Sequence, residues 1–202
     1  TLECWLQLVS PATINYVPIV IKGQGDGGTV NCNYGLFFYK RTALGDTDAR
    51  RIEIAFKTDG SWQYTYSTTK LEVGKWYHVV GLFDGKKLKV YLNGQLENSW
   101  STTAVPSTNT DPLFLGFNGY ASYKASRSFI IDELRIYNRA LTEDEIKDNI
   151  KGKITMDGLV LWYRFDEGSG SSVRDVSGAG HTASFGSPGP TWVDGVERSD
   201  VE

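Results

Sequence analysis

The stretch that decides the fold is "GKWYHVVGLFDGKKLKVYLNGQL", residues 74–96. Apolar and polar residues alternate along it, which is the pattern of half-buried strands. The pattern is broken at Asp84-Gly85 and again at Asn93-Gly94, two dipeptides that supply the positive φ required by tight hairpin turns. The stretch therefore predicts three consecutive antiparallel strands.

The same alternation recurs along most of the chain. The further segments that show it are "TLECWLQLV" (1–9), "NYGLFFYK" (33–40), "RIEIAFKTDG" (51–60), "SWQYTYSTT" (61–69), "PLFLGF" (112–117) and "SFIIDELRIYN" (128–138). One helix is predicted in "LTEDEIKDNIKGK" (141–153), where Thr142 and Glu145 have the spacing of a capping box. Many short strands with a single short helix predict an all-β fold, a two-sheet antiparallel sandwich.

The composition agrees with a strand-rich protein. Aromatic residues make up 13% of the 202 residues, and such side chains fit pleated sheet surfaces. A net charge of −3 is too weak to indicate nucleic acid, and no apolar stretch approaches the about 20 residues that cross a bilayer. Cys4 and Cys32 allow at most one disulfide, and the sequence leaves open whether they are bridged or remain two buried free thiols.

Two segments together resemble the laminin-G-like, concanavalin A-like jelly-roll family. They are residues 74–96 and "FIIDELRIYNRALTEDEI" (129–146), whose family-type residues occur in family order: Trp76, His78, Asp84-Gly85, Tyr91, Asn93-Gly94, Asp132-Glu133 and residues 135–141. The resemblance covers residues 1–151. It implies a concanavalin A-like jelly roll with a short peripheral helix, and an extracellular or cell-surface location.

The resemblance reappears in the tail, because "LVLWYRFDEGSGSSVRDVSGAG" (159–180) and "TWVDG" (191–195) look like the usual beginning of the family. We therefore expect one domain over residues 1–202, with a main body (1–151) and a family N-terminal segment carried at the C-terminus (152–202). Three arrangements fit. The segment completes its own sheet, completes a neighbouring copy by strand addition, or begins the next repeat of a longer chain. Self-completion is favoured, because local closure costs little loop entropy.

No arrangement of residues indicates catalysis. Glycosidases on this fold carry carboxylates that alternate along one strand, whereas Asp132 and Glu133 are adjacent and are predicted to lie on opposite faces. The acids of 143–145 lie at the predicted helix start. His78 and His181 have no neighbouring nucleophile, and His78 is predicted to be a hydrogen-bonded, partly buried histidine. We therefore expect that the protein is not an enzyme.

Aromatic residues indicate carbohydrate binding, because sugars stack their C–H faces on Trp and Tyr rings. Trp5, Trp76 and Trp162 lie within strong strand patterns and are predicted to be buried. For the strand that carries Trp62, a core role and a sugar platform both remain open. The predicted ligand-binding residues are Trp62, Tyr64, Trp100, Asn118, Tyr120 and Tyr123.

The family resemblance also implies one structural calcium ion near the Asp-Glu-Leu strand. Calcium takes six to eight oxygen ligands, and the Asp/Gly-rich turns could supply them. The predicted ligands are Asp132 and Glu167, followed by Asp166 and Asp175. The alternative is that these aspartates and glycines only form turns.

The sequence thus predicts a non-catalytic extracellular recognition or adhesion module that binds carbohydrate. Its partner would be a glycan or another cell-surface ligand, without nucleic acid and without membrane insertion. The alternative is a structural cell-surface protein that self-assembles by strand complementation between copies. A glycan-cleaving enzyme is the third and least favoured hypothesis.

Overall fold

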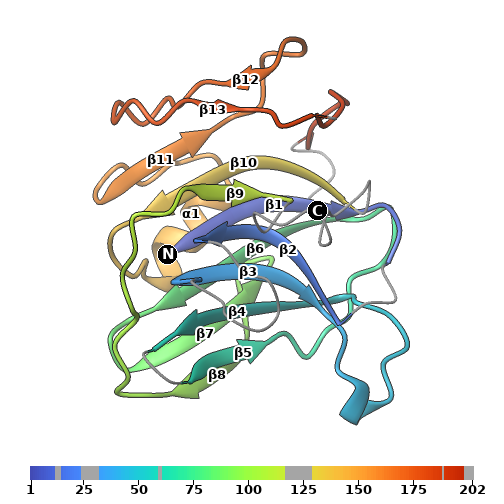
Figure 1. Ribbon diagram of the computed structural model, residues 1–202, viewed down its shortest axis with the longest axis vertical. Coiled ribbons are helices and arrows are strands. Elements are labelled where there is room, and N and C mark those ends of the chain that lie inside the picture. The colour runs from blue at the N-terminus through green and yellow to red at the C-terminus, as the bar shows by residue number, and fades with distance from the viewer. Residues whose placement is uncertain (12–14, 24–31, 59–60, 117–128, 188, 198–202) are drawn as a thin grey trace.

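The computed structural model describes residues 1–11, 15–23, 32–58, 61–116, 129–187 and 189–197. Their strands form two antiparallel sheets that pack face to face, with a single helix among the described residues, α1 (Glu143–Ile150) (Figure 1). The predicted all-β jelly-roll sandwich is therefore confirmed.

One sheet has six strands and is built around the three strands predicted from residues 74–96. Its order is β11 (Leu159–Tyr163), β10 (Phe129–Tyr137), β1 (Leu2–Leu8), β6 (Trp76–Phe83), β7 (Lys87–Leu92) and β8 (Gln95–Ser101). Both predicted hairpin turns have the positive φ that they require, with values of 87° at Gly85, 48° at Asn93 and 76° at Gly94. The turn dipeptides therefore set the registers of this meander.

The second sheet has five strands. Its order is β5 (Trp62–Tyr66), β4 (Arg51–Lys57), β3 (Tyr34–Tyr39), β2 (Tyr16–Lys22) and β9 (Leu113–Leu115). A single 3₁₀ turn, η1 (Thr42–Leu44), follows β3. A small two-stranded sheet of β12 (Ser172–Val173) and β13 (Ala183–Ser184) lies beyond β11 (Figure 1).

The core lies between the two sheets and takes alternate residues from each strand. From β1 it takes Leu2, Cys4 and Leu6, and from β4 it takes Ile52 and Phe56. The residues between them point to the outer faces of the sandwich. Cys4 and Cys32 are both buried free thiols, which lie in different apolar clusters.

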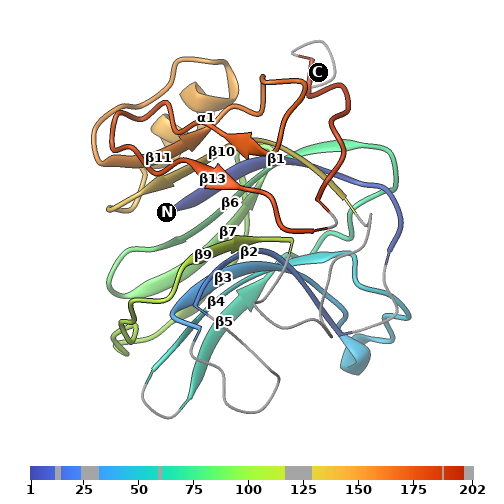
Figure 2. The same ribbon diagram turned by 45° about the horizontal axis from the view of Figure 1, so that its top comes forward.

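Helix α1 covers the outer face of the six-stranded sheet (Figure 2). Its Ile146 is fully buried against Val80, Leu82 and Tyr91 of that sheet. The predicted capping box is present, since the Thr142 side chain accepts from the Glu145 amide and the Glu145 carboxylate accepts from the Thr142 amide. The part of this face around Val80, Leu82 and Tyr91 is therefore covered by the helix.

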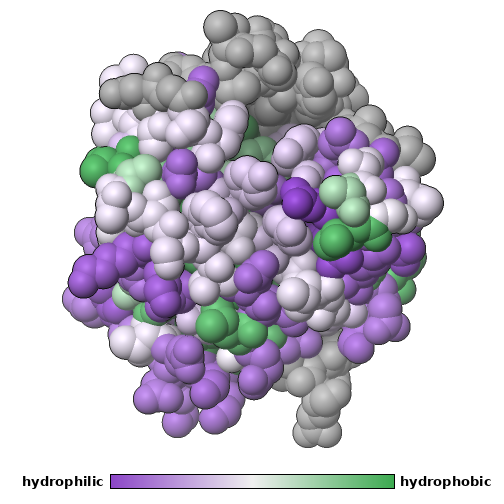
Figure 3. All heavy atoms as spheres, turned by 90° about the horizontal axis from the view of Figure 1, so that it is seen from below, coloured by the Kyte–Doolittle hydropathy of each residue, from purple (hydrophilic) through white to green (hydrophobic). Residues whose placement is uncertain are grey.

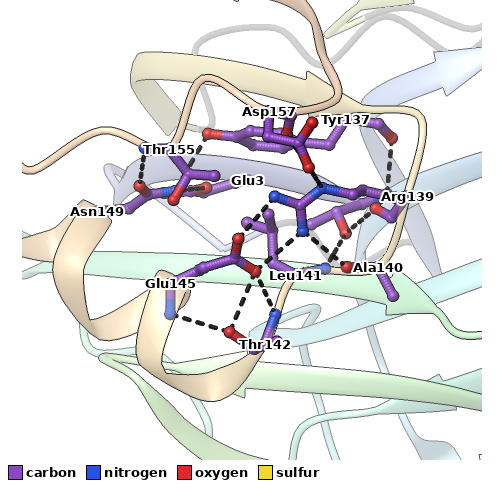
Figure 4. Close-up of polar contacts among 11 residues, drawn as sticks. Glu3, Tyr137, Arg139, Ala140, Leu141, Thr142, Glu145, Asn149, Thr155 and Asp157 are labelled. Atoms are coloured by element: carbon purple, nitrogen blue, oxygen red, sulfur yellow. Dashed lines mark hydrogen bonds and ion pairs between the residues drawn. The ribbon is translucent and has the colours of Figure 1, made fainter.

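Polar contacts fasten the helix to the sheet (Figure 4). Arg139 pairs with Glu145 at 2.6 Å and with Asp157 at 2.8 Å. Asn149 donates to the carboxylate of Glu3 at 2.8 Å and to the hydroxyl of Tyr137 at 3.1 Å. The side of the molecule that carries α1 is therefore held by packing and by charge-assisted hydrogen bonds.

His78 belongs to this structural network. Its ring is fully buried, its Nε2 lies 2.8 Å from Glu3 Oε1, and it packs edge-on against Trp5. Burial alone would raise the pKa of Glu3, but the hydrogen bond from His78 and the charge of Arg135 hold it below its usual value. The predicted hydrogen-bonded histidine is confirmed, and it is more deeply buried than expected.

The tail segment forms β11, which pairs with β10 at the edge of the six-stranded sheet. Leu161 and Tyr163 point into the core, at 6% and 4% exposure. A pairing within one chain and the same pairing between two chains bury the same surface. Self-completion and strand exchange between copies therefore both remain open.

Two expectations about this sheet are wrong. Asp132 and Glu133 do not lie on opposite faces, because a β-bulge with φ of 51° at Glu133 turns both side chains to the outer side, where Glu133 contacts Arg135 and Trp162. Trp162 is only half-buried, between the guanidinium groups of Arg135 and Arg164, whereas Trp5 and Trp76 are buried as predicted.

Candidate functional site

The outer face of the five-stranded sheet carries an unusual density of aromatic side chains. Tyr16 of β2, Tyr39 of β3 and the β5 residues Trp62, Tyr64 and Tyr66 point to this side, because their strand neighbours face the core. We call this surface the aromatic face. It differs from the other outer face because α1 packs on the six-stranded sheet.

Three of these rings are accessible to a ligand. Trp62 is 37% exposed, Tyr64 is 39% exposed and Tyr16 is 44% exposed. Trp62 and Tyr64 stand two residues apart on the edge strand β5, which places them on the same side about 7 Å apart. A strand on which a sugar stacks must expose its aromatic rings, and Trp62 and Tyr64 are exposed in this way.

The remaining aromatic residues form a connected cluster beside the exposed pair. Tyr16 stacks on Tyr39 with ring centroids 5.0 Å apart, and Tyr39 lies 5.6 Å from Tyr66. The guanidinium of Arg41 lies over the Tyr66 ring, 5.0 Å from its centroid, and donates to the Tyr39 hydroxyl at 3.3 Å. The cluster therefore joins three strands and the loop after β3.

Glu53 lies beneath this cluster. It is opposite Phe37 in β3 and Tyr66 in β5, and its side chain is 3% exposed. Its Oε2 has no hydrogen-bond partner among the described residues. Burial raises the pKa of Glu53 to about 8, although the charge of Arg41 opposes this, so the carboxyl is mainly protonated at neutral pH.

Trp100 lies apart from the aromatic face. It is opposite Leu88, a core residue of β7, so its ring turns towards the edge where the two sheets meet. There its Nε1 lies 3.4 Å from the side-chain oxygen of Gln63, and 54% of its surface is exposed. Figure 3 shows the molecule from the side of β5 and β8, where the surface is hydrophilic to near-neutral and the hydrophobic patches are small and separate.

Three further predicted ligand-binding residues, Asn118, Tyr120 and Tyr123, lie outside the described residues. The structure thus brings together Trp62 and Tyr64 and separates them from Trp100. It also places at the aromatic face residues that were not among the predicted ligand-binding residues. The added residues are Tyr16, Tyr39, Arg41 and Glu53. For Tyr39 a signal was present, since "YGLFFY" carries apolar residues on both faces of one strand, as expected where both sides are covered.

The predicted calcium ligands take part in turns and loop contacts. Asp175 accepts hydrogen bonds from the amides of Trp162, Ser177 and His181. Although burial opposes it, these bonds lower the pKa of Asp175 to about 2. Both oxygens of Asp175 are therefore already engaged in holding the loop that follows β11.

The other three carboxylates behave similarly. Asp132 accepts from the amides of Glu133 and Val196, and a Cβ on Gly195 would clash with its carboxylate. Glu167 accepts from the Arg174 amide, and Asp166 pairs with Arg164. Among the described residues, no group of three His, Cys, Asp or Glu side chains could hold a metal ion. These residues fit turn formation better than a calcium cage, and calcium binding stays a prediction.

The double sheet, the peripheral helix and the exposed aromatic face together define a lectin-like jelly roll. The chain belongs to the concanavalin A-like lectin/glucanases superfamily, whose laminin G-type family model matches residues 1–147. The family resemblance drawn from residues 74–96 and 129–146 is therefore confirmed. A comparison with curated proteins finds no match.

Solved structures share the fold at low sequence identity. A Bacteroides ovatus protein whose proposed role is carbohydrate binding has a TM-score of 0.67 at 20% identity, covering 92% of this chain and 52% of that one. The receptor-binding domain of botulinum neurotoxin type G has a TM-score of 0.54 at 16% identity, covering 92% and 48%. The binding domain of paraclostridial mosquitocidal protein 1 has a TM-score of 0.51 at 17% identity, covering 72% and 35%.

This chain therefore spans about half the length of the Bacteroides ovatus and botulinum proteins that it resembles. At these identities the likeness concerns the fold. None of the described helical segments is long and apolar enough to span a membrane.

Proposed function

We propose that this protein is a non-catalytic, extracellular carbohydrate-binding module that holds its glycan on the aromatic face of the five-stranded sheet. Membership in the lectin/glucanase superfamily supports the ligand class. The role of the Bacteroides ovatus relative points in the same direction, although it belongs to that protein. An extracellular or cell-surface location fits the use of such modules in recognition and adhesion.

The observation that carries the proposal is the exposed pair of Trp62 and Tyr64. Large aromatic side chains are normally buried, and two of them on one edge strand offer adjacent flat surfaces for sugar rings. The sheet beneath them is rigid, because β4 is paired on both sides, with β3 and β5. A rigid platform lowers the ordering cost of binding.

The carboxylates support a non-catalytic role. Glycoside hydrolysis uses two carboxyl groups that flank one bond. Glu53 is the single carboxylate that the described strands place beneath the aromatic face, and Asp132 and Glu133 lie on the other sheet. Asp132 is also covered by the segment around Gly195. A binding role therefore fits these groups better than hydrolysis.

The proposal is tested on a glycan array with wild-type protein and the variants Trp62→Ala and Tyr64→Ala. Truncating an aromatic residue at the centre of a binding surface typically costs about 2 kcal/mol or more, so we expect each variant to lose about tenfold or more in affinity. Trp100→Ala is the matched control, since it removes an exposed tryptophan away from the aromatic face.

The expected result is selective loss in the two β5 variants, with unchanged thermal midpoints. Absence of glycan binding by the wild type would contradict the proposed function. Equal binding by all variants would remove the aromatic face as its site. Loss confined to Trp100→Ala would move the site to the edge where the sheets meet.

A further inference from the structure

The aromatic face has a corner with two polar groups that the described residues leave without partners. One is Oε2 of Glu53, at 3% residue exposure, and the other is Nε of Arg41. Buried polar atoms without partners are rare in folded proteins, and they are costly unless a ligand or an ordered water satisfies them. Nε of Arg41 is a hydrogen-bond donor, and a protonated Glu53 carboxyl both donates and accepts. The two groups therefore point to a ligand that carries hydrogen-bond acceptors and donors.

Both groups belong to the same corner. Arg41 contacts Tyr66 and Tyr39, and Tyr66 is the direct register partner of Glu53. The charge of Arg41 also acts on the Glu53 carboxyl. The two unpartnered groups therefore face one site rather than two.

The charge balance of the corner is positive. The carboxylate of Asp46 accepts a hydrogen bond from the backbone amide of Arg41. It is already paired with Arg51 at 2.7 Å and with Lys70 at 2.6 Å. Glu53 carries little charge at neutral pH. Asp46 is therefore neutralised by Arg51 and Lys70, and the guanidinium of Arg41 has no anionic partner among the described residues.

Tyrosine rings border the corner and limit the kind of anion that fits. Tyr16 and Tyr64 are 44% and 39% exposed, so that their rings can contact a carbon skeleton beside the charged group. A bare inorganic ion would leave these rings unused. A sugar that carries a carboxylate would use the rings, the cation and the protonated carboxyl together.

We propose that this corner binds the carboxylate of an acidic sugar, with Arg41 receiving the carboxylate and Glu53 hydrogen-bonding a neighbouring hydroxyl. Tyr16 and Tyr64 then contact the sugar ring. This inference rests on the proposed function, because it assigns the class of sugar held by the same aromatic face. Hexuronic acids and sialic acids share the required group.

The experiment compares glycans that end in glucuronic, galacturonic or sialic acid with the methyl ester of each, by calorimetry at fixed salt. The ester removes the charge and keeps the sugar. We expect each favoured acid to bind about tenfold or more tightly than its ester, as for a charge-assisted hydrogen bond. The affinities for the three acids show whether the site prefers a hexuronic acid or a sialic acid.

Variants assign the effect to the corner. Arg41→Gln is expected to bring the acid down to the affinity of its ester, while Arg41→Lys retains part of the preference because it keeps the charge but loses the planar fork. Arg174→Gln is the matched control, since that exposed arginine lies in the tail. Circular dichroism of each variant separates loss of binding from loss of fold.

Equal affinity for acid and ester, or an acid preference that survives Arg41→Gln in folded protein, overturns the inference. If neutral glycans bind through Trp62 and Tyr64 without any acid preference, the inference fails and the proposed function stands. If no glycan binds, both fail.

Discussion

At the scale of single residues, Glu53 is a buried carboxyl group, one oxygen of which has no hydrogen-bond partner among the described residues. Apolar and aromatic side chains lie beside it, including Phe37 in the adjacent strand, and the charge of Arg41 opposes the effect of burial on its pKa. A carboxyl group in such surroundings is neutral at a pH where it would ionise in water. Its protonation is therefore linked to folding.

The sign of this linkage follows from the pKa of Glu53, which is about 8 in the folded chain and near 4.5 in the unfolded chain. Between these values the unfolded chain releases the proton while the folded chain keeps it. The stabilising contribution of the protonated carboxyl is thus complete below about pH 4.5 and is lost as pH rises towards 8. The titratable and charged groups beside Glu53 are Arg41, Tyr16, Tyr39, Tyr64 and Tyr66.

We therefore predict that Glu53→Gln removes a fall in stability between pH 5 and pH 8. Urea unfolding at several pH values measures this, with Glu72→Gln, an exposed glutamate, as the control. Parallel pH dependences of wild type and Glu53→Gln would show that Glu53 ionises normally.

A feature that is set by neighbouring residues in the chain can be predicted from the sequence, whereas a feature that depends on distant strands cannot. Asn93-Gly94 marks a turn by its own backbone preference, and Thr142 caps a helix three residues away from Glu145. The burial of Glu53 depends on rings from β2, β3 and β5, which only the assembled sheet brings together. Likewise, nothing in Asp-Glu-Leu marks the bulge at Glu133.

At the scale of elements, β11 is held from both sides. On one side it pairs with β10, and on the other the loop after it closes the edge, since Asp175 accepts from the Trp162 amide and the Val176 amide donates to the Trp162 carbonyl. A closed edge is protected against pairing with another chain. Because local closure costs little loop entropy, we propose that residues 152–202 complete the sandwich of their own chain.

This proposal predicts that the chain sediments as a 22.5 kDa monomer from micromolar to millimolar concentration. Leu161→Ala should lower its free energy of unfolding by about 2–4 kcal/mol, because Leu161 lies in the core, and by the same amount at every concentration. Val176→Ala, at an exposed position of the same tail, is the control. A dimer that Leu161→Ala dissociates would instead support strand complementation between copies.

At the scale of the whole molecule, the two outer faces of the sandwich differ in what lies on them. Helix α1 and the network of Glu3, His78 and Asn149 cover part of the outer face of the six-stranded sheet. The opposite face carries exposed rings and unpartnered polar groups. The asymmetry follows from topology, because the helix connects β10 to β11 on one side of one sheet (Figure 2).

The most direct test of this division is a titration of isotope-labelled protein with the best-bound glycan, followed by backbone amide chemical shifts. We predict that the perturbed amides concentrate on β5 and on the neighbouring outer residues Tyr16, Tyr39 and Glu53, and that α1 and β11 are unaffected. Perturbations confined to the tail around Asp132 and Asp175, or to the edge around Trp100, would contradict the account.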